Sequence, residues 1–232
     1  MITEKLILSS EEVIEKVFDS YKHNHGFLLT YLNQHSFNIY FEDEKYRSLL
    51  DENFNVYQAD SGMYLFLKYL KKKNVKRIDA TELNERIINK IIVEKIPAAI
   101  IGGKFKEEFI KEKSSEKKIN LCYYHHGYFD ENEYEKVITK ISSLNANFIF
   151  IGMGIPKQEY FAEKLNQELK NKIIICTGNF LEFYFGTVKR SPLLLRKARL
   201  EWVHRLFTEP KRLWKRYIIG IPVFFYRALK SL

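Results

Sequence analysis

Short apolar runs alternate with amphipathic segments along most of the chain. Six runs rich in β-branched and aromatic residues each end in small or polar residues, as buried strands do; they span 27–32, 55–60, 98–103, 119–124, 147–154 and 173–179. Apolar residues at helical spacing predict helices over 62–73, 80–95, 104–113, 131–144 and 157–170. This alternation predicts an α/β fold with a mostly parallel sheet and helices on both of its faces.

The C-terminal segment has a different character. Residues 190–232 hold eleven of the 38 Lys and Arg but only Glu201 and Glu209 of the 29 Asp and Glu, so the whole formal charge of +9 falls there. A balanced body with a cationic, aromatic end indicates contact with phosphate, nucleic acid or lipid headgroups. We therefore divide the chain into an α/β core, residues 1–190, and a basic helical C-terminal appendage, residues 191–232.

Targeting signals and cysteine chemistry give little further information. The start of the chain has charges and no long apolar stretch with a cleavage site, so we expect no secretory signal. The apolar stretch Tyr217–Tyr226 is about half the ~20 residues that a spanning helix needs. Cys122 and Cys176 lie in apolar runs without metal-ligand spacing, which indicates reduced thiols in a cytoplasmic protein.

Ligands of parallel α/β sheets collect at the carboxyl ends of the strands, so candidate chemistry is sought there. Asp60 follows the strand 55–58 and precedes a helix. It has two interpretations, as an N-cap that accepts backbone N–H bonds or as a general base at the crevice. The pattern of the sequence favours neither.

Two further strand ends carry weaker signals. Gly102 and Gly103 end an apolar strand, and paired glycines suit either close approach to a diphosphate or an ordinary turn. His125 and His126 end the next strand, where neighbours should point to opposite faces, which disfavours joint binding of one metal. One imidazole near substrate is the functional alternative to a structural pair.

The fourth strand end is the stretch IGMGIPKQEYF. Gly152 and Gly154 open a turn, Pro156 suits the first turn of a helix, and Lys157 at a helix N-terminus would be helped by a nearby anion. A solvated helix start explains the same residues. The motifs of metal-dependent sugar transfer, zinc hydrolysis and α/β-hydrolases (DxD after an apolar strand, HExxH and GxSxG) are missing from the sequence.

In their order, these motifs resemble the WecG/TagA/CpsF family of bacterial glycosyltransferases, glycosyltransferase family 26. The resemblance runs from about residue 30 to residue 217, and it is carried by QADSG, IIGG, YYHHGYF, IGMGIPKQE, TGNFLEFYFGTVKRSP and RLEWVHRLFTEPKRLWKRY. It implies a Rossmann-like α/β fold with an appendage that completes the active site. It also implies inverting, metal-independent transfer from a UDP-sugar to a lipid-linked acceptor.

The resemblance also assigns roles to residues. Asp60 matches the catalytic base, Asn33 matches an asparagine of the sugar pocket, and Gln158 matches a glutamine near the donor. The family carries Thr two residues before this asparagine, whereas this chain has Tyr31 there and Thr30 just before it. Substrate contacts are therefore expected from Thr30, Asn33, Gly102, Gly103, His126, Gly152, Gly154 and Gln158.

In the appendage, the resemblance places Arg205 and Arg212, with Lys215 or Arg216, at the diphosphate of UDP. Without a metal, the charge on the leaving diphosphate needs fixed cations, and Arg binds phosphate oxygens in pairs. The alternative is an apolar stripe through Leu206 and Leu213 with the cations merely solvated on the other face.

The predicted partners are a UDP-sugar, a lipid-diphosphate-linked sugar and the inner face of the cytoplasmic membrane, in the synthesis of a cell-surface polysaccharide or teichoic acid. We expect no cofactor, no metal and no nucleic acid, and a homo-oligomer stays open. Two rival hypotheses use the same basic tail: a nucleic-acid-binding module and a peripheral membrane scaffold without catalysis. Neither explains the residues at the strand ends.

Overall fold

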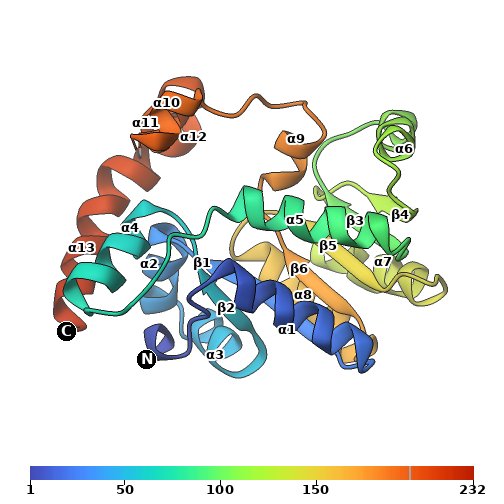
Figure 1. Cartoon of the computed structure of the whole chain (residues 1–232), viewed down its shortest axis with the longest axis horizontal. Helices are drawn as coiled ribbons and strands as arrows, with labels where there is room; N and C mark the ends of the chain where they lie inside the picture. The colour runs from blue at the N-terminus through green and yellow to red at the C-terminus, as the bar shows by residue number, and fades with distance from the viewer. Residues whose placement is uncertain (199) are drawn as a thin grey trace.

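A six-stranded parallel sheet forms the centre of the molecule (Figure 1). The computed structural model describes residues 1–198 and 200–232. The strands follow the spatial order β2-β1-β6-β5-β3-β4, and every neighbouring pair is parallel. They are β1 Phe27–Leu32, β2 Asn55–Gln58, β3 Ala98–Gly102, β4 Leu121–His125, β5 Phe148–Gly152 and β6 Ile173–Cys176. The predicted α/β class with a parallel sheet is confirmed.

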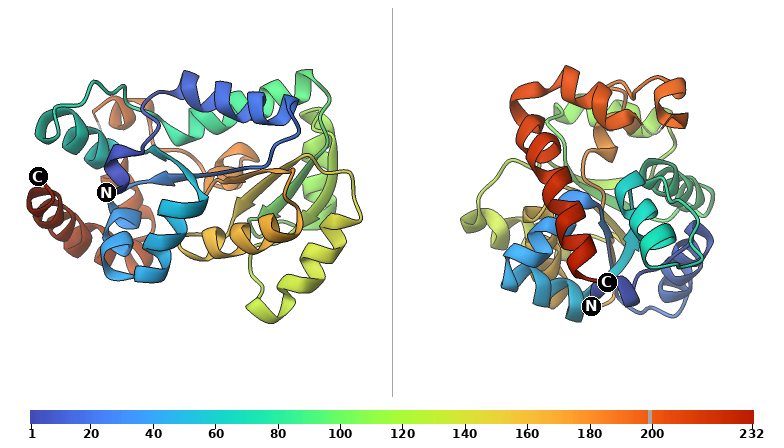
Figure 2. Two further views of the ribbon diagram at one scale, coloured as in Figure 1. Left: turned by 90° about the horizontal axis from the view of Figure 1, so that it is seen from below. Right: turned by 90° about the vertical axis from the view of Figure 1, so that its left-hand side faces the viewer.

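Helices cover both faces of the sheet because successive strand residues point to opposite sides and are apolar on both. In β5, Phe148 and Phe150 pack on one side with α1 and α5, whereas Ile149 and Ile151 pack on the other with α7 and α8 (Figure 2). The bounds are α1 Ser10–Lys22, α5 Ala80–Val93, α6 Glu107–Glu116, α7 Tyr134–Ser142, α8 Lys157–Glu168 and α9 Phe180–Tyr184.

A third apolar cluster lies beside the β2 edge of the sheet and joins the C-terminal helices to the body. Its helices are α2 Gln34–Glu42, α3 Glu44–Asn53, α4 Ser61–Leu65, the π-helical turn η2 Phe66–Leu70 and α13 Gly220–Lys230. Phe224 of α13 is fully buried, and its ring lies 5.2 Å from Phe37 of α2 and 6.1 Å from Phe66. Asn38 donates to the carbonyl of Gly220 at 2.8 Å.

The predicted helical character of the appendage is also confirmed. Its helices are α10 Leu193–Lys197, α11 Glu201–Thr208, α12 Pro210–Trp214, the π-helical turn η4 Lys215–Ile219 and α13. The chain crosses from α9 to α10, and α12, η4 and α13 then run on as one long helical arm along the end of the molecule (Figure 1). The boundary between residues 190 and 191 stays a prediction.

The helices of the described part of the chain include none that is both long enough and apolar enough to cross a bilayer. Cys122 and Cys176 are both free thiols, as the sequence predicts, and Cys176 is buried.

We expect Phe224→Ala to lower the free energy of unfolding by roughly 3 to 5 kcal/mol, because it leaves a cavity between α13, α2 and η2. Phe225→Ala is the matched control, because the neighbouring ring is 40% exposed and its loss should cost less than about 1 kcal/mol. Urea unfolding of both variants checks this. Equal effects would mean that α13 is not anchored through Phe224.

Candidate active site

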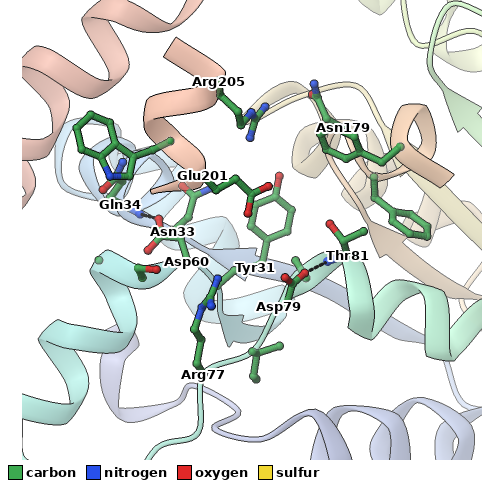
Figure 3. A pocket seen from close by; sticks show the side chains of 18 of the residues that line it. Tyr31, Asn33, Gln34, Asp60, Arg77, Asp79, Thr81, Asn179, Glu201 and Arg205 are labelled. Carbon is green, nitrogen blue, oxygen red and sulfur yellow. Dashed lines mark hydrogen bonds between the residues drawn. The ribbon is translucent and has the colours of Figure 1, made fainter. Parts of the chain in front are cut away.

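One cavity lies at the carboxyl ends of β1, β2 and β6, under the C-terminal appendage (Figure 3). Its walls come from four places: the turns that follow these three strands, the N-termini of α2, α4 and α5, the loop that enters α5, and helices of the appendage. The lining residues used below are Tyr31, Asn33, Gln34, Asp60, Arg77, Asp79, Thr81, Thr177, Asn179, Glu201, Trp202, Arg205, Arg216 and Tyr217.

Asp60 lies where two helix N-termini meet. Its Oδ1 accepts a hydrogen bond from the Met63 N–H of α4, and its Oδ2 accepts one from the Gln34 N–H of α2, both at 2.9 Å. The backbone of Asp60 has a φ of 75°, an uncommon conformation for a residue with a side chain. Strain of this kind occurs at functional sites when surrounding contacts enforce it. The N-cap interpretation of Asp60 is confirmed, and the carboxylate also faces the cavity.

The acidity of Asp60 suits proton transfer near neutral pH. Burial raises the pKa of Asp60 to about 6, although the N–H groups of Gln34 and Met63 and the charge of Arg216 lower it. A carboxylate with a pKa close to the working pH is an efficient general base. With this pKa, Asp60 is mostly ionised at pH 7 and can accept a proton.

Asn33 is the N-cap of α2, the helix whose Gln34 N–H binds Asp60. Its Oδ1 accepts hydrogen bonds from the N–H groups of His35 and Ser36 at 2.9 Å, so the side chain is fixed at the start of α2. Asn33 lies in the cavity wall, as the sequence predicts for a pocket residue. The N-termini of α2, α4 and α5 all reach this cavity. Helix N-termini carry partial positive charge, so the cavity favours anions.

Three arginines line the cavity without a carboxylate partner among the residues that the structure describes: Arg77, Arg205 and Arg216. Arg205 enters from the appendage and Arg77 from the opposite side (Figure 3). The Nε atoms of Arg77 and Arg216 are buried and have no hydrogen-bond partner in the described part of the chain. A buried N–H group without an acceptor is unfavourable, and a bound anion would supply the acceptor.

The other two predicted tail cations lie elsewhere. Arg212 donates from Nε to Glu209 at 2.6 Å, and Lys215 lies over the ring of Trp214. Neither residue is part of the cavity wall. The structure therefore brings Arg205 and Arg216 to the site and leaves Arg212 and Lys215 on the outside of the arm.

Thr30 and Gln158 lie beneath the cavity rather than in its wall. Both are fully buried, and each donates to Oε1 of the buried Glu159, Thr30 at 2.7 Å and Gln158 at 2.8 Å. Gln158 also accepts the N–H of Gly178 at 3.1 Å. Neither residue lines the cavity, and the direct substrate contacts expected of Thr30 and Gln158 stay predictions. Their hydrogen bonds instead connect β1 and α8 to the turn between Thr177 and Asn179.

Tyr31 and Gly178 are fitted to each other at the floor of the cavity. Gly178 has a φ of 57°, and a Cβ there would lie 2.3 Å from the Tyr31 hydroxyl. A side chain at position 178 would therefore displace either the turn or the Tyr31 ring. Tyr31 stands where the resembled family carries Thr, and it lines the cavity.

The predicted glycines of β3 and β5 bring strands together. A Cβ on Gly102 would lie 2.7 Å from the carbonyl oxygen of Gly152, and one on Gly152 would lie 2.6 Å from that of Gly178. None of the predicted glycines, which are Gly102, Gly103, Gly152 and Gly154, lines the cavity. Close packing between neighbouring strand ends accounts for Gly102 and Gly152.

His126 also lies away from the cavity, beyond the end of β4. The expectation that the two histidines point apart is wrong, because β4 ends at His125 and the ring centroids lie only 4.5 Å apart. In the described part of the chain, no group of three or more His, Cys, Asp and Glu side chains is placed to hold a metal ion.

Several cavity residues were missed by the sequence reasoning: Arg77, Asp79, Asn179, Glu201 and Trp202. Arg77 and Asp79 belong to the loop that leads into α5, and this loop does not follow a strand end, where ligands of parallel sheets are expected. The sequence does contain one signal, since Asp79 is an N-cap that accepts from Thr81 N–H at 2.9 Å. Trp202 lines the site next to Tyr217 of the helical arm, and the centroids of the two rings are 5.9 Å apart.

Comparison with known proteins gives a consistent result. The sequence model described as Glycosyl transferase WecG/TagA/CpsF family matches residues 5–232. Two curated relatives, from Staphylococcus aureus strains MRSA252 and NCTC 8325 / PS 47, are each 26% identical over 227 residues. These matches cover 97% of this chain and 88% of each relative. Both relatives are named N-acetylglucosaminyldiphosphoundecaprenol N-acetyl-beta-D-mannosaminyltransferase.

The buried carboxyl of Glu159 should make stability depend on pH. Burial raises its pKa to about 7 from an ordinary value of 4.5, so the folded state favours the protonated form. The protonated Glu159 carboxyl therefore contributes fully to the free energy of unfolding below about pH 4.5. This contribution, about 3 kcal/mol, is lost as the pH rises through 7.

We therefore expect Glu159→Gln to reduce the loss of unfolding free energy between pH 5 and 8. Urea unfolding at several pH values measures it, with Glu168→Gln as an exposed control on the same helix. The assignment fails if Glu159→Gln and the wild type lose stability in parallel.

Proposed function

Because this chain belongs to the WecG/TagA/CpsF family and is a glycosyltransferase, we propose that it moves a sugar from a UDP-sugar to a lipid-diphosphate-linked sugar. The observation that carries the proposal is the position of Asp60. Its carboxylate is held by two backbone N–H groups in a cavity that also contains arginines with no carboxylate partner among the described residues. A base and fixed cations in one cavity are what transfer to a hydroxyl with a diphosphate leaving group requires.

The donor diphosphate is assigned to Arg205 and Arg216. Both side chains come from the appendage and reach the same cavity, and Arg216 lies close enough to Asp60 to lower its pKa. Two guanidinium groups can bind the four outer oxygens of a diphosphate in pairs and stabilise the charge that develops as it leaves. In this mechanism the arginines replace the divalent cation that many sugar transferases use.

The reaction is a single displacement at the anomeric carbon. An acceptor hydroxyl gives its proton to Asp60 as its oxygen forms the new bond, and the bond from the anomeric carbon to the diphosphate breaks, releasing UDP. The configuration inverts in one such step. The relatives' names specify a β-linked product, which is the product of inversion at an α-linked donor.

The substrate pair of the relatives is our proposal for the chemical class of substrates. Their names describe an N-acetylmannosamine residue transferred to N-acetylglucosaminyl-diphospho-undecaprenol. We infer a hexose or N-acetylhexosamine donor and a polyprenyl-diphosphate-sugar acceptor. The match to a glycosyltransferase family does not favour the rival nucleic-acid-binding function.

The outer face of the helical arm supports contact with a membrane surface. Large apolar side chains are exposed there at helical spacing, and cations flank them. Such a stripe inserts into the headgroup region while Lys and Arg meet anionic lipid. We propose peripheral attachment at the inner face of the cell membrane, where a lipid-linked acceptor is reached. The exposed apolar residues are Trp214, Ile218, Ile219, Phe225, Tyr226, Leu229 and Leu232.

Transfer from a panel of UDP-sugars to a short prenyl-diphosphate-GlcNAc tests the proposed reaction. Asp60→Asn should lower kcat by roughly 10² to 10⁴ while the Kd for UDP stays unchanged, because Asn has nearly the same shape and its Oδ1 keeps one of the two caps, but it cannot take the proton. Wild-type kcat/KM should rise with pH through about 6 as Asp60 ionises. Asp19→Asn, on the surface of α1, is the control.

Full transfer by the Asp60→Asn variant would remove Asp60 from the role of base. If the wild type transfers none of the sugars, the proposed donor class is wrong.

For the membrane proposal, the triple variant Trp214→Ser, Ile218→Ser and Leu229→Ser should bind vesicles of phosphatidylglycerol and phosphatidylcholine at least tenfold more weakly. The apolar stripe is lost in this variant, whereas Arg205 and Arg216 remain. Cosedimentation measures it, and Val93→Ser, at an exposed site on α5, is the control. Unchanged sedimentation of the triple variant would contradict the proposal.

A further inference from the structure

A second cavity lies next to the candidate active site. It is enclosed by the start of α1, the first turns of α5, the loop that precedes α5, and α10 of the appendage. Arg77 and Asp79 line both cavities, so the two share a wall. Two further arginines, Arg86 and Arg196, line only the second one.

The carboxylates of this cavity leave its arginines largely unneutralised. Asp79 is fully engaged, because Nη2 of Arg190 donates to both of its oxygens, at 3.2 and 3.0 Å, and the N–H groups of α5 bind it as a cap. Glu82 is exposed at the rim. Arg86 forms a solvent-exposed ion pair with Glu11 at 3.2 Å.

Arg77 and Arg196 have no carboxylate partner among residues 1–198 and 200–232. The Nε atom of each is buried and has no hydrogen-bond partner in that part of the chain. Two buried N–H donors that face one cavity from separate elements need an acceptor with several oxygens. Phosphate oxygens match the planar donor pairs of Arg, which makes a diphosphate the ligand that fits.

We propose that this second cavity binds the diphosphate of the lipid-linked acceptor. The inference rests on the proposed function, in which two diphosphates must be held at once, one of UDP and one of the acceptor. Arg205 enters the candidate active site from the appendage, Arg77 enters from the opposite side, and Asp60 lies between them in height (Figure 3).

A single displacement requires this separation. The leaving diphosphate and the attacking hydroxyl lie on opposite sides of the anomeric carbon, so cations for the donor and cations for the acceptor belong on opposite sides of the site. An acceptor whose hydroxyl meets Asp60 carries its diphosphate one sugar ring away. Arg77 and Asp79 line both cavities, so the second cavity adjoins the reaction centre at these two residues.

Helix α10 of the appendage connects the second cavity to the protein surface, where the lipid chain of the acceptor would lie. Arg196 of α10 lines the cavity, whereas Leu194, two residues earlier on the same helix, is 78% exposed. A polyprenyl chain whose diphosphate is bound at Arg196 leaves the protein beside the exposed Leu194 side chain. This arrangement connects the cavity to the membrane that holds the acceptor.

Binding tests the inference without turnover. With UDP saturating, titration calorimetry with farnesyl diphosphate should show binding to the wild type and at least a tenfold higher Kd for Arg196→Gln. Arg47→Gln, a surface arginine on α3, is the matched control and should bind as the wild type does. Inorganic pyrophosphate should bind severalfold more weakly than farnesyl diphosphate, because it lacks the prenyl chain.

Any of three binding results overturns the inference: no farnesyl diphosphate binding by the wild type, an unchanged Kd in Arg196→Gln, or equal affinity for pyrophosphate and farnesyl diphosphate, which would indicate a site for free phosphates. Since no sugar is transferred, these results do not depend on the identity of the donor sugar or on proton transfer to Asp60.

Steady-state kinetics then separates the two diphosphate sites. Arg196→Gln should raise the KM for prenyl-diphosphate-GlcNAc at least tenfold and leave the Kd for UDP unchanged, whereas Arg205→Gln should raise the Kd for UDP. A higher Kd for UDP in Arg196→Gln with an unchanged acceptor KM would assign the second cavity to the donor and overturn the inference. A general loss of fold would lower the melting temperature of Arg196→Gln relative to Arg47→Gln.

Discussion

The site depends on one carboxylate that accepts hydrogen bonds from two helices. Asp60 binds the N–H of Met63 in its own helix and that of Gln34 in the helix after the neighbouring strand. This pair of bonds ties the turns after β1 and β2 together and holds the backbone of Asp60 at a φ of 75°. The same carboxylate thereby fixes the cavity wall and faces its interior, so structure and chemistry rest on one group.

The electrostatic design of the cavity is asymmetric. The carboxylate of Asp79 is neutralised by Arg190, whereas Arg77, Arg205 and Arg216 have no carboxylate partner in the described part of the chain. Burial lowers the pKa of Arg216 and raises that of Asp60. In both groups burial disfavours the charged form, and a bound diphosphate offsets this cost for the cations.

A second layer of buried polar groups supports the floor. Glu159 receives hydrogen bonds from Thr30 and Gln158, and Gln158 holds the N–H of Gly178, whose turn carries Thr177 and Asn179 into the cavity. A fully buried carboxyl in this place is explained by its bonds to two elements. Burial raises the pKa of Glu159 to about 7, so a large fraction of this carboxyl is protonated at neutral pH, which reduces the cost of burying it.

The sequence by itself determined the α/β class, the parallel sheet and the helical, cationic tail, because hydrophobic period and charge distribution are local properties of the chain. It also located Asp60, since an N-cap at a strand end has a recognisable local pattern, and the motifs that identified the family located Asn33. Arg205 and Arg216 could be told apart from Arg212 and Lys215 only in the structure, where the rotation of the helical arm decides which cations face the cavity.

Tertiary structure likewise decided the positions of Gln158 and Thr30, which are buried beneath the site, and of Gly102 and Gly152, which bring strands together. It also brought Arg77 and Arg196 to one cavity from segments far apart in the chain. The physical reason is that a side chain's neighbours depend on strand order and on the docking of α13, and both are set by long-range burial that no local pattern encodes.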